Sequence, residues 1–241
     1  DYDDKYFLDL SISRDGNSRF GSDKRFGYFP AVSVGWKLSN ENFLKDSNII
    51  NFLKMRVSYG TAGNVAGIGQ NYSVTSVAFP SYNNLNGAAP AGTVNNPNLG
   101  WEDVATLNAG LEFKLFNSRI TGTVDYFIAN RTNFYFQDLL ATEAGGYSQR
   151  INAGEFENKG LELTLNADII RTRDFTWNVF GNISFIKSEI LDLNGEPEIF
   201  TGSTVQRVGG MVGEYFLVRY AGVNPGNGEP LYYDIDGNVT N

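Results

Sequence analysis

Two carboxylates with a spacing that acid–base chemistry can use stand at Glu155 and Glu157. In an extended segment side chains alternate, so these two lie on the same face. Paired carboxylates of this kind can hydrolyse a glycosidic bond. The chain has no His and no Cys, however, and it therefore lacks the commonest general base and any thiolate nucleophile. The chain is predicted not to be an enzyme, and a glycosidase is a distant alternative.

Two further stretches have residue types that could hold an ion or a phosphate. Residues 234–238 (DIDGN) resemble part of a calcium loop, but the Gly comes too early and no Glu follows. A hairpin turn on Asp236 and Gly237 is the better interpretation. Residues 60–69 are rich in Gly but have neither the Lys nor the following helix of a phosphate-binding loop. The sequence therefore predicts no catalytic residue, no metal ligand and no cofactor.

Composition excludes some partners and favours others. The net charge is −8, and binding to phosphate backbones requires clustered Lys and Arg, so nucleic acid is not expected as a partner. Aromatic residues make up 14% of the chain, with 18 Phe and 13 Tyr, which suits a protein with aromatic belts at a membrane interface. No apolar run approaches the ~18 residues of a membrane helix.

The elements that must position these residues are strands with one apolar face. In residues 159–169 (KGLELTLNADI), Leu161, Leu163 and Leu165 point one way, while Glu162 and Thr164 point the other. Comparable runs are expected at 6–13, 28–38, 53–60, 107–115, 120–128, 175–185 and 214–220. Most are close to the ~9–11 residues that a tilted strand needs to cross the hydrocarbon layer.

The connections between these runs alternate in length. Tight turns are expected after residues 115 and 169, and the longest connection, 61–104, is predicted to be an extracellular loop. Long loops at one end and short turns at the other are typical of outer-membrane barrels. The polar face includes Lys54, Arg56 and Glu112, which suit a wet lumen. The predicted fold is an all-β, antiparallel, up-and-down transmembrane β-barrel in part, with about eight strands of a larger barrel.

Several phrases of the sequence are similar to those of one known family. They are YFPAVSVGWKL at 28–38, NFLKMRVSYGTAGN at 51–64, NPNLGWE at 96–102, LFNSR at 115–119, NKGLE at 158–162 and VGEYF at 212–216. They occur in order over nearly the whole chain. On these phrases the chain resembles the SusC/RagA family of TonB-linked outer-membrane transporters of Bacteroidetes.

This resemblance implies a function, a location and a set of partners. Members of the family are plugged barrels of around 22 strands in the cell outer membrane, and they import oligosaccharides or peptides with a SusD-like surface lipoprotein as a lid. Residues 1–241 are then expected to be a fragment of such a barrel, with the plug domain and the final strands absent. The expected partners are outer-membrane lipid, the remaining strands and plug, the SusD-like lipoprotein, and TonB through the missing amino-terminal part.

Aromatic residues in and beside the long loop are the predicted substrate contacts. Sugar faces stack on aromatic rings, so Tyr72, Tyr82 and Trp101 are the candidates, together with Phe79, and packing within the loop is the alternative. The second hypothesis for the whole chain is a soluble or surface β-sandwich module that binds glycans. A sandwich would interlock the apolar faces of two sheets in a dry interior, whereas a barrel wall leaves its apolar face outward.

Overall fold

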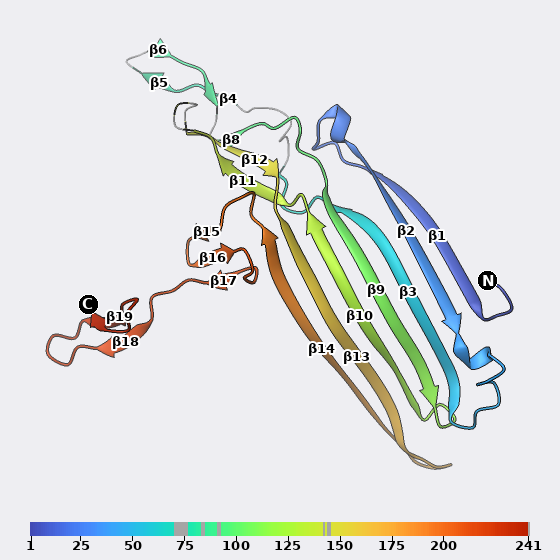
Figure 1. The fold of residues 1–241 in the computed structure, drawn as a ribbon. Coiled ribbons are helices and arrows are strands. Elements are labelled where there is room, and N and C mark those ends of the chain that lie inside the picture. Colours follow the sequence, from blue (N-terminus) through green and yellow to red (C-terminus); the bar gives the residue numbers. More distant parts are fainter. Residues whose placement is uncertain (70–76, 83–84, 91–92, 142, 144–145, 241) are drawn as a thin grey trace.

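Seven long strands of the chain form one antiparallel sheet. The structure is a computed structural model that describes residues 1–69, 77–82, 85–90, 93–141, 143 and 146–240. The strands lie side by side in the order in which they occur along the chain (Figure 1). They are β1 (Tyr6–Gly16), β2 (Phe26–Lys37), β3 (Ile50–Asn64), β9 (Glu102–Leu115), β10 (Ile120–Thr132), β13 (Glu155–Arg171) and β14 (Thr176–Asp192). The up-and-down order of the long strands expected from the sequence is therefore confirmed.

The connections differ at the two ends of the sheet. At one end lie the tight turns 116–119 and 172–175, together with the connection 38–49, which contains the short helix η2 (Leu38–Asn40). In the first turn Asn117 and Ser118 have positive φ values of 56° and 60°, as the primed turns of tight hairpins require. The remaining connections leave the opposite end, which we call the loop end (Figure 1).

Short strands in the loop-end connections, and in the segment after β14, form small sheets of their own. In chain order these elements are η1 (Ser22–Lys24), β4 (Val77–Ala78), β5 (Ser81–Tyr82), β6 (Leu85–Asn86), β7 (Ala89–Pro90), β8 (Thr93–Val94), β11 (Tyr135–Leu139), β12 (Ser148–Asn152), β15 (Glu198–Thr201), β16 (Thr204–Arg207), β17 (Glu214–Tyr215), β18 (Tyr220–Val223), β19 (Pro230–Tyr233) and β20 (Val239–Thr240). No helix in the described part of the chain is long and apolar enough to cross a membrane.

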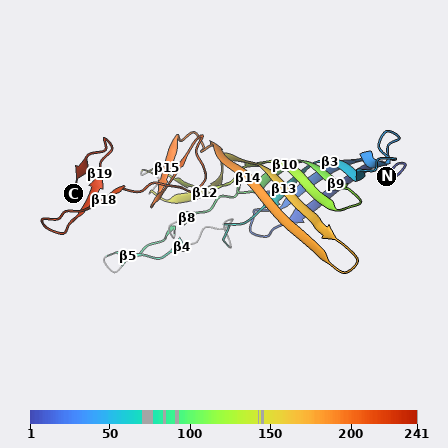
Figure 2. The same ribbon diagram turned by 90° about the horizontal axis from the view of Figure 1, so that it is seen from below.

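One face of the large sheet, which we call the apolar face, is exposed. One register row across all seven strands consists of Tyr6, Trp36, Met55, Leu111, Val124, Leu163 and Ile183. On β1 the side chains of Leu8, Leu10 and Ile12 are 63%, 70% and 71% exposed. The sheet is a single layer (Figure 2), and no second sheet of the described residues covers it. The alternative of a soluble sandwich is therefore wrong, because a sandwich buries its apolar faces against each other.

The apolar runs of the seven strands together form a band on this face, which we call the apolar band, and it crosses the sheet obliquely. The run on β1 covers 6–12 and has its midpoint at Asp9, and the run on β14 covers 177–185 and has its midpoint at Gly181. The register partner of Asp9 on β14, followed strand by strand, is Ile186, five residues from Gly181. Over six strand spacings this drift corresponds to a strand tilt of about 30°, with ~3.4 Å per residue and ~4.8 Å per strand. Transmembrane strands tilt by about 35–45°, so the band is close to a flat layer crossed by tilted strands.

The opposite face, which we call the polar face, carries an ion-pair network. Arg56 on β3 reaches across β9 to Asp125 on β10, with Nη2 2.5 Å from Oδ1, and its Nε lies 3.6 Å from Oε1 of Glu112. Gly110 is the register partner of both Arg56 and Asp125. A Cβ at Gly110 would lie 2.5 Å from Oδ1 of Asp125 and 2.6 Å from Nε of Arg56. The absence of a side chain at Gly110 therefore allows the pair to span two strand spacings.

One of the predicted runs is not a strand of this sheet. In the run 214–220 the only strand residues are the two of β17, which pairs with β16, and Tyr220, the first residue of β18. Phe216, Leu217 and Val218 follow it with side chains that are 53%, 66% and 70% exposed. Apolar residues at successive positions lack the alternation that gives a strand two distinct faces, so this run was misinterpreted. The connection predicted at 61–104 spans 65–101, because β3 and β9 both extend beyond the alternating segments.

Replacing Gly110 with Ala is expected to separate Arg56 from Asp125 and to destabilise the protein by about 1–3 kcal/mol, as overpacking does. The unfolding temperature of the full-length protein in detergent measures this. Gly181→Ala is the matched control, because no heavy atom lies within 4 Å of a Cβ built there, and its effect should stay within about 0.5 kcal/mol. Equal effects of the two substitutions would contradict the role given to Gly110.

Candidate functional site

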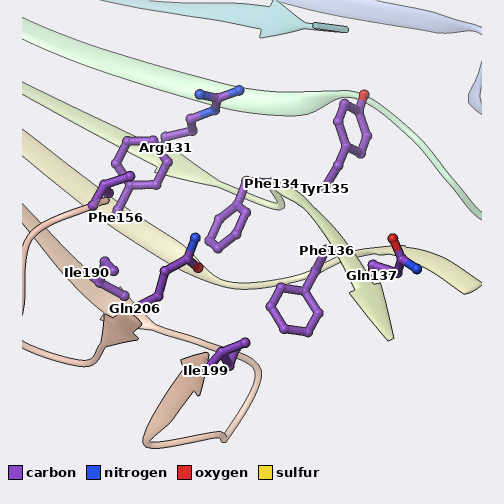
Figure 3. A pocket seen from close by; sticks show the side chains of 10 residues that line it. Arg131, Phe134, Tyr135, Phe136, Gln137, Phe156, Ile190, Ile199 and Gln206 are labelled. Carbon is purple, nitrogen blue, oxygen red and sulfur yellow. The ribbon is translucent and has the colours of Figure 1, made fainter. Parts of the chain in front are cut away.

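A pocket on the polar face at the loop end is the candidate functional site (Figure 3). It has a cavity volume of about 360 Å³, and it is lined by Arg131, Phe134, Tyr135, Phe136, Gln137, Phe156, Ile190, Ile199, Gln206 and Val212. Arg131, Phe156 and Ile190 are register partners on β10, β13 and β14. The other lining residues come from the connections around β11, β15 and β16, so the long strands form the base of the pocket and the loops form its sides.

Three Phe rings provide much of the apolar wall. Phe134 packs edge-to-face against Phe136 and Phe156, with ring centroids 6.4 Å and 5.8 Å apart and interplanar angles of 74° and 67°. Gly154 has φ +78° and leaves the space for this packing, since a Cβ there would lie 2.3 Å from the Phe134 ring. Figure 3 shows the side chain of Gln206 extending towards Phe134, so an amide group lies beside the rings.

A buried carboxylate anchors the loop end next to this pocket. Glu102, the first residue of β9, is 3% exposed. Its carboxylate accepts hydrogen bonds from Nη2 of Arg131, from Nδ2 of Asn64 at 2.5 Å, and from the backbone N–H of Tyr135 at 2.8 Å. The buried charge is thus both paired and hydrogen-bonded, as burial of a carboxylate requires. Through these contacts Glu102 joins β3, β10 and β11 at the point where the sheet gives way to the loops.

Tyr135 links this anchor to the long connection 65–101. Its hydroxyl lies 2.9 Å from the carbonyl oxygen of Gly100 and 3.2 Å from that of Asn64. Burial, with the charge of Glu102 as a second cause, raises the pKa of the Tyr135 hydroxyl above its ordinary value, so it stays a neutral donor. A small apolar cluster packs beside it and consists of Phe20, Ile68 and Leu99, with Val65 and Trp101 against them.

Side chains of β12 tie the long connection to this cluster. Asn152 accepts a hydrogen bond from the backbone N–H of Gly100 at 2.7 Å and donates one to the carbonyl oxygen of Asn133 at 2.9 Å. Arg150, also on β12, donates to the carbonyl oxygen of Gly67. The connection 65–101 is therefore held near both of its ends by side chains that are distant in the sequence.

The pocket has the chemistry of a binding site. Phe rings offer apolar surface, and the amides of Gln137 and Gln206 can each donate and accept hydrogen bonds. The guanidinium of Arg131 is engaged by Glu102. Among the described residues no group of three or more His, Cys, Asp or Glu could hold a metal ion. The arrangement suits a ligand that combines apolar surface with polar groups.

The carboxylates considered for acid–base catalysis lie outside the pocket. Glu157 pairs with Lys159 on the apolar face of β13, with 2.7 Å between Oε1 and Nζ. Glu155 is the register partner of Asp192 at the loop end of β14. Glu157 is thus engaged by an ammonium, and neither carboxylate lines the pocket.

The segment considered for calcium forms a hairpin turn. Residues 234–238 connect β19 to β20, and Gly237 has φ +84°. Oδ1 of Asp234 accepts hydrogen bonds from the backbone N–H of Asn238 at 2.8 Å and of Asp236 at 3.0 Å. Hydrogen bonds from the backbone and then the side chain of Asn238 lower the pKa of Asp234. The interpretation of this segment as a turn is confirmed.

The predicted substrate contacts are only partly covered by the structure. Tyr72 lies outside the described residues, and Tyr82 ends β5 without a described side chain. Trp101 is half-buried, and its ring centroid lies 5.4 Å from that of Phe20 and 5.5 Å from that of Phe29. This is the loop packing that was the alternative at Trp101, and its contact with substrate stays a prediction.

Sequence reasoning missed the residues that line the pocket. Phe134 and Phe136 follow the alternating part of β10, and the run FYF at 134–136 was the one available signal of an aromatic cluster. Gln206 had no signal, because β16 belongs to a small sheet with β15 and β17 and not to an alternating run of the large sheet. Phe79, a further candidate, has a side chain that is 75% exposed.

Comparisons with known proteins give a consistent result. Residues 1–233 match the family described as TonB dependent receptor-like, beta-barrel. The chain is 37% identical over 224 residues to TonB-dependent receptor P39 of Formosa agariphila, covering 92% of this chain and 21% of that protein. It is 32% identical over 264 residues to TonB-dependent receptor SusC of Bacteroides thetaiotaomicron, covering 98% of this chain and 26% of that protein. The chain thus spans about a quarter or less of the length of these relatives.

Solved structures match the fold as well. The structure of the RagAB peptide importer in the 'open-open' state aligns with a TM-score of 0.87 and 28% identity, over 100% of this chain and 27% of that one. The structure of the RagAB peptide transporter aligns with a TM-score of 0.84 and 27% identity, over 99% of this chain and 27% of that one. These matches confirm the partial all-β barrel expected from the sequence.

Replacing Glu102 with Ala is expected to loosen the loop end, because it leaves the guanidinium of Arg131 without its carboxylate. Breaking a buried pair in this way costs about 3–5 kcal/mol. In the full-length protein the connection 65–101 should become sensitive to limited proteolysis at a lower temperature than in the wild type. Glu112→Ala removes a carboxylate whose side chain is 38% exposed, and it should change stability by no more than about 1 kcal/mol. Wild-type protease resistance of Glu102→Ala would contradict the anchor.

Proposed function

Since the chain belongs to the TonB dependent receptor-like β-barrel family, we propose that it forms part of the wall and the extracellular loops of an importer in the cell outer membrane. The proposed substrate is an oligosaccharide or a peptide, the two classes implied by the resemblance to the SusC/RagA family. One solved structural neighbour is described as a peptide importer. The chain has no catalytic role in this proposal, and the relatives named above are described as receptors or transporters.

The two-faced sheet is the observation that carries this proposal. Its apolar face is continuous in register across seven strands, exposed, and inclined to the strands by about 30°. Lipid can cover such a face without a second protein layer. Its polar face carries Arg56, Glu112 and Asp125, and charges of this kind are stable beside water but costly in a dry core. A barrel wall with lipid outside and water inside satisfies both faces.

The edges of the sheet support a larger barrel. β1 and β14 each pair with only one neighbour in the sheet, so each has a second edge whose backbone N–H and C=O groups pair with no strand of the described residues. Such open edges do not occur in the hydrocarbon core of a membrane, because it contains no water to bind them. We therefore propose that strands from outside residues 1–241 complete the cylinder and that a plug outside this range receives energy from TonB. A SusD-like lipoprotein covers the loop end in this arrangement, where the connections from β3, β10 and β14 gather.

The aromatic pocket at the loop end is the proposed contact for the substrate. It opens on the polar face, so it borders the lumen rather than the lipid. Its rings can pack against an apolar side chain of a peptide or against the face of a sugar, while its amides bind polar groups. Tyr72, Tyr82 and Trp101 remain proposed contacts in the adjoining connection.

Replacing Leu163 with Arg tests the assignment of the faces. Leu163 lies on the apolar face two residues from Leu165, the centre of the apolar run on β13. The substitution should cost ~2–4 kcal/mol near the bilayer midplane and reduce the amount of folded protein in the outer membrane. Thr164→Arg, one residue away on the polar face, should leave that amount unchanged. Equal tolerance of the two substitutions would contradict the proposal.

Replacing Phe136 with Ala tests the pocket. If the ring contacts the substrate, the Kd of the full-length importer for its oligosaccharide or peptide should rise roughly 5- to 30-fold, as loss of an aromatic contact worth ~1–2 kcal/mol predicts. Phe185→Ala is the matched control, because Phe185 is 61% exposed on the apolar face. An unchanged Kd for Phe136→Ala, or the same rise for both variants, would exclude the pocket as a substrate contact.

A further inference from the structure

Three cationic side chains stand on the apolar face of the seven long strands, all of which are described. They are Arg14 on β1, Lys159 on β13 and Lys187 on β14. Each is at the loop end of the apolar run on its strand, and no Lys or Arg of these strands points from the same face near the tight turns. The cations therefore mark one border of the apolar band and not the other.

The three cations lie at similar heights above the middle of the band. Along their own strands they are five or six residues from the midpoints of the apolar runs, which are Asp9, Leu165 and Gly181. With ~3.4 Å per residue and a tilt of about 30°, these distances correspond to about 15–18 Å along the normal of the band. Half of a hydrocarbon core of ~30 Å ends at ~15 Å, so the cations lie at or just beyond its border. The side chains thus reach the layer in which lipid phosphates lie.

Arg14 is held in place by aromatic rings. Its guanidinium carbon lies 4.0 Å from the centroid of the Phe26 ring and 5.6 Å from that of Tyr28. Arg14 is exposed, and it forms no ion pair with any carboxylate of the described residues. A guanidinium stacked on rings at the border of an apolar face keeps its donors free for an acceptor in the headgroup layer.

Lys159 and Lys187 form a second cationic position. They are register partners on adjacent strands. Each ammonium contacts the Glu two residues further from the band, with Lys159 Nζ 2.7 Å from Glu157 Oε1 and Lys187 Nζ 2.6 Å from Glu189 Oε2. An ammonium has three donors, so each keeps donors for a further acceptor. From the band outwards the order is apolar, cationic and then anionic.

We propose that Arg14, Lys159 and Lys187 bind the phosphate groups of lipid headgroups in the leaflet at the loop end. The proposal rests on the proposed membrane-spanning barrel. The charge of the three side chains is complementary to phosphate, and their heights are those of the headgroups. The contact is specific to one leaflet, because the opposite border of the apolar face has no such cations on its strands.

Binding of lipid A to the purified full-length protein in an uncharged detergent tests this. Native mass spectrometry or a melting shift gives the affinity for diphosphoryl lipid A, for lipid A without phosphates, and for inorganic phosphate. The wild type should bind the diphosphoryl form best and should not bind inorganic phosphate measurably. The triple variant Arg14→Gln, Lys159→Gln, Lys187→Gln should lose on the order of 100-fold in affinity, with about fivefold for each cation.

Single variants sharpen the test. Arg14→Gln should have the largest single effect, because Arg14 forms no ion pair with a carboxylate of the described residues that would offset its charge. Lys187→Arg should keep wild-type affinity. Lys114→Gln is the matched control, since Lys114 lies on the polar face with its Nζ 5.6 Å from the centroid of the Phe52 ring, and it should bind like the wild type.

Three results would overturn the lipid contact. They are wild-type affinity in the triple variant, equal affinity for lipid A with and without phosphates, and displacement of lipid A by millimolar inorganic phosphate. The membrane-spanning barrel is tested separately by Leu163→Arg and Thr164→Arg. If those two variants differ as expected while the triple variant binds lipid normally, only the lipid contact fails.

Discussion

Strand register is the constraint on which the rest of this structure depends. Side chains alternate along a strand, so a slip of one residue would exchange the two faces. It would place Arg56 and Asp125 towards the apolar side and Leu111 and Val124 towards the charges. The register shared by seven strands instead aligns apolar residues in continuous rows and keeps the ion pair across Gly110 on the other face. The inclined apolar band follows from this register without any further interaction.

The two ends of the sheet are built differently, and this difference is why the candidate site is assigned to the loop end. The tight turns leave little room for side chains to converge. At the loop end, by contrast, the buried carboxylate of Glu102 joins three strands and the base of the long connection. The aromatic pocket lies directly beside this anchor because Arg131 belongs to both. A rigid base under the loops is what a binding site at the mouth of a barrel needs.

The parts of the fold that were predictable are those that repeat along the chain. Alternation located the seven long strands, since on each of them most of the apolar side chains occupy one face. It did not give their ends, because beyond the apolar band the alternation breaks down: Glu157 and Lys159 on β13 point from the apolar face, while Phe156, the residue before Glu157, lies on the polar face. The run at 214–220 was misinterpreted because its aromatic and aliphatic content resembled a strand, whereas its apolar residues stand at successive positions.

The candidate site was mostly beyond sequence reasoning for a physical reason. Its walls come from segments that approach one another only after the sheet has formed, and neither Phe134 nor Gln206 belongs to a periodic pattern. Trp101 was found as an aromatic residue beside the long connection, but its packing against Phe20 depends on a contact between distant segments. Local pattern therefore predicts the wall, and only tertiary structure identifies the pocket.

The central claim is that lipid covers one face of the strands and water the other. The most direct measurement is a cysteine scan of residues 161–168 in the full-length protein, freed of any other Cys and kept in native membranes; this chain has none of its own. Reaction with a charged, membrane-impermeant thiol reagent should alternate, with positions 162, 164 and 166 labelled and positions 161, 163 and 165 protected. Uniform labelling, or labelling of the opposite set, would contradict the account.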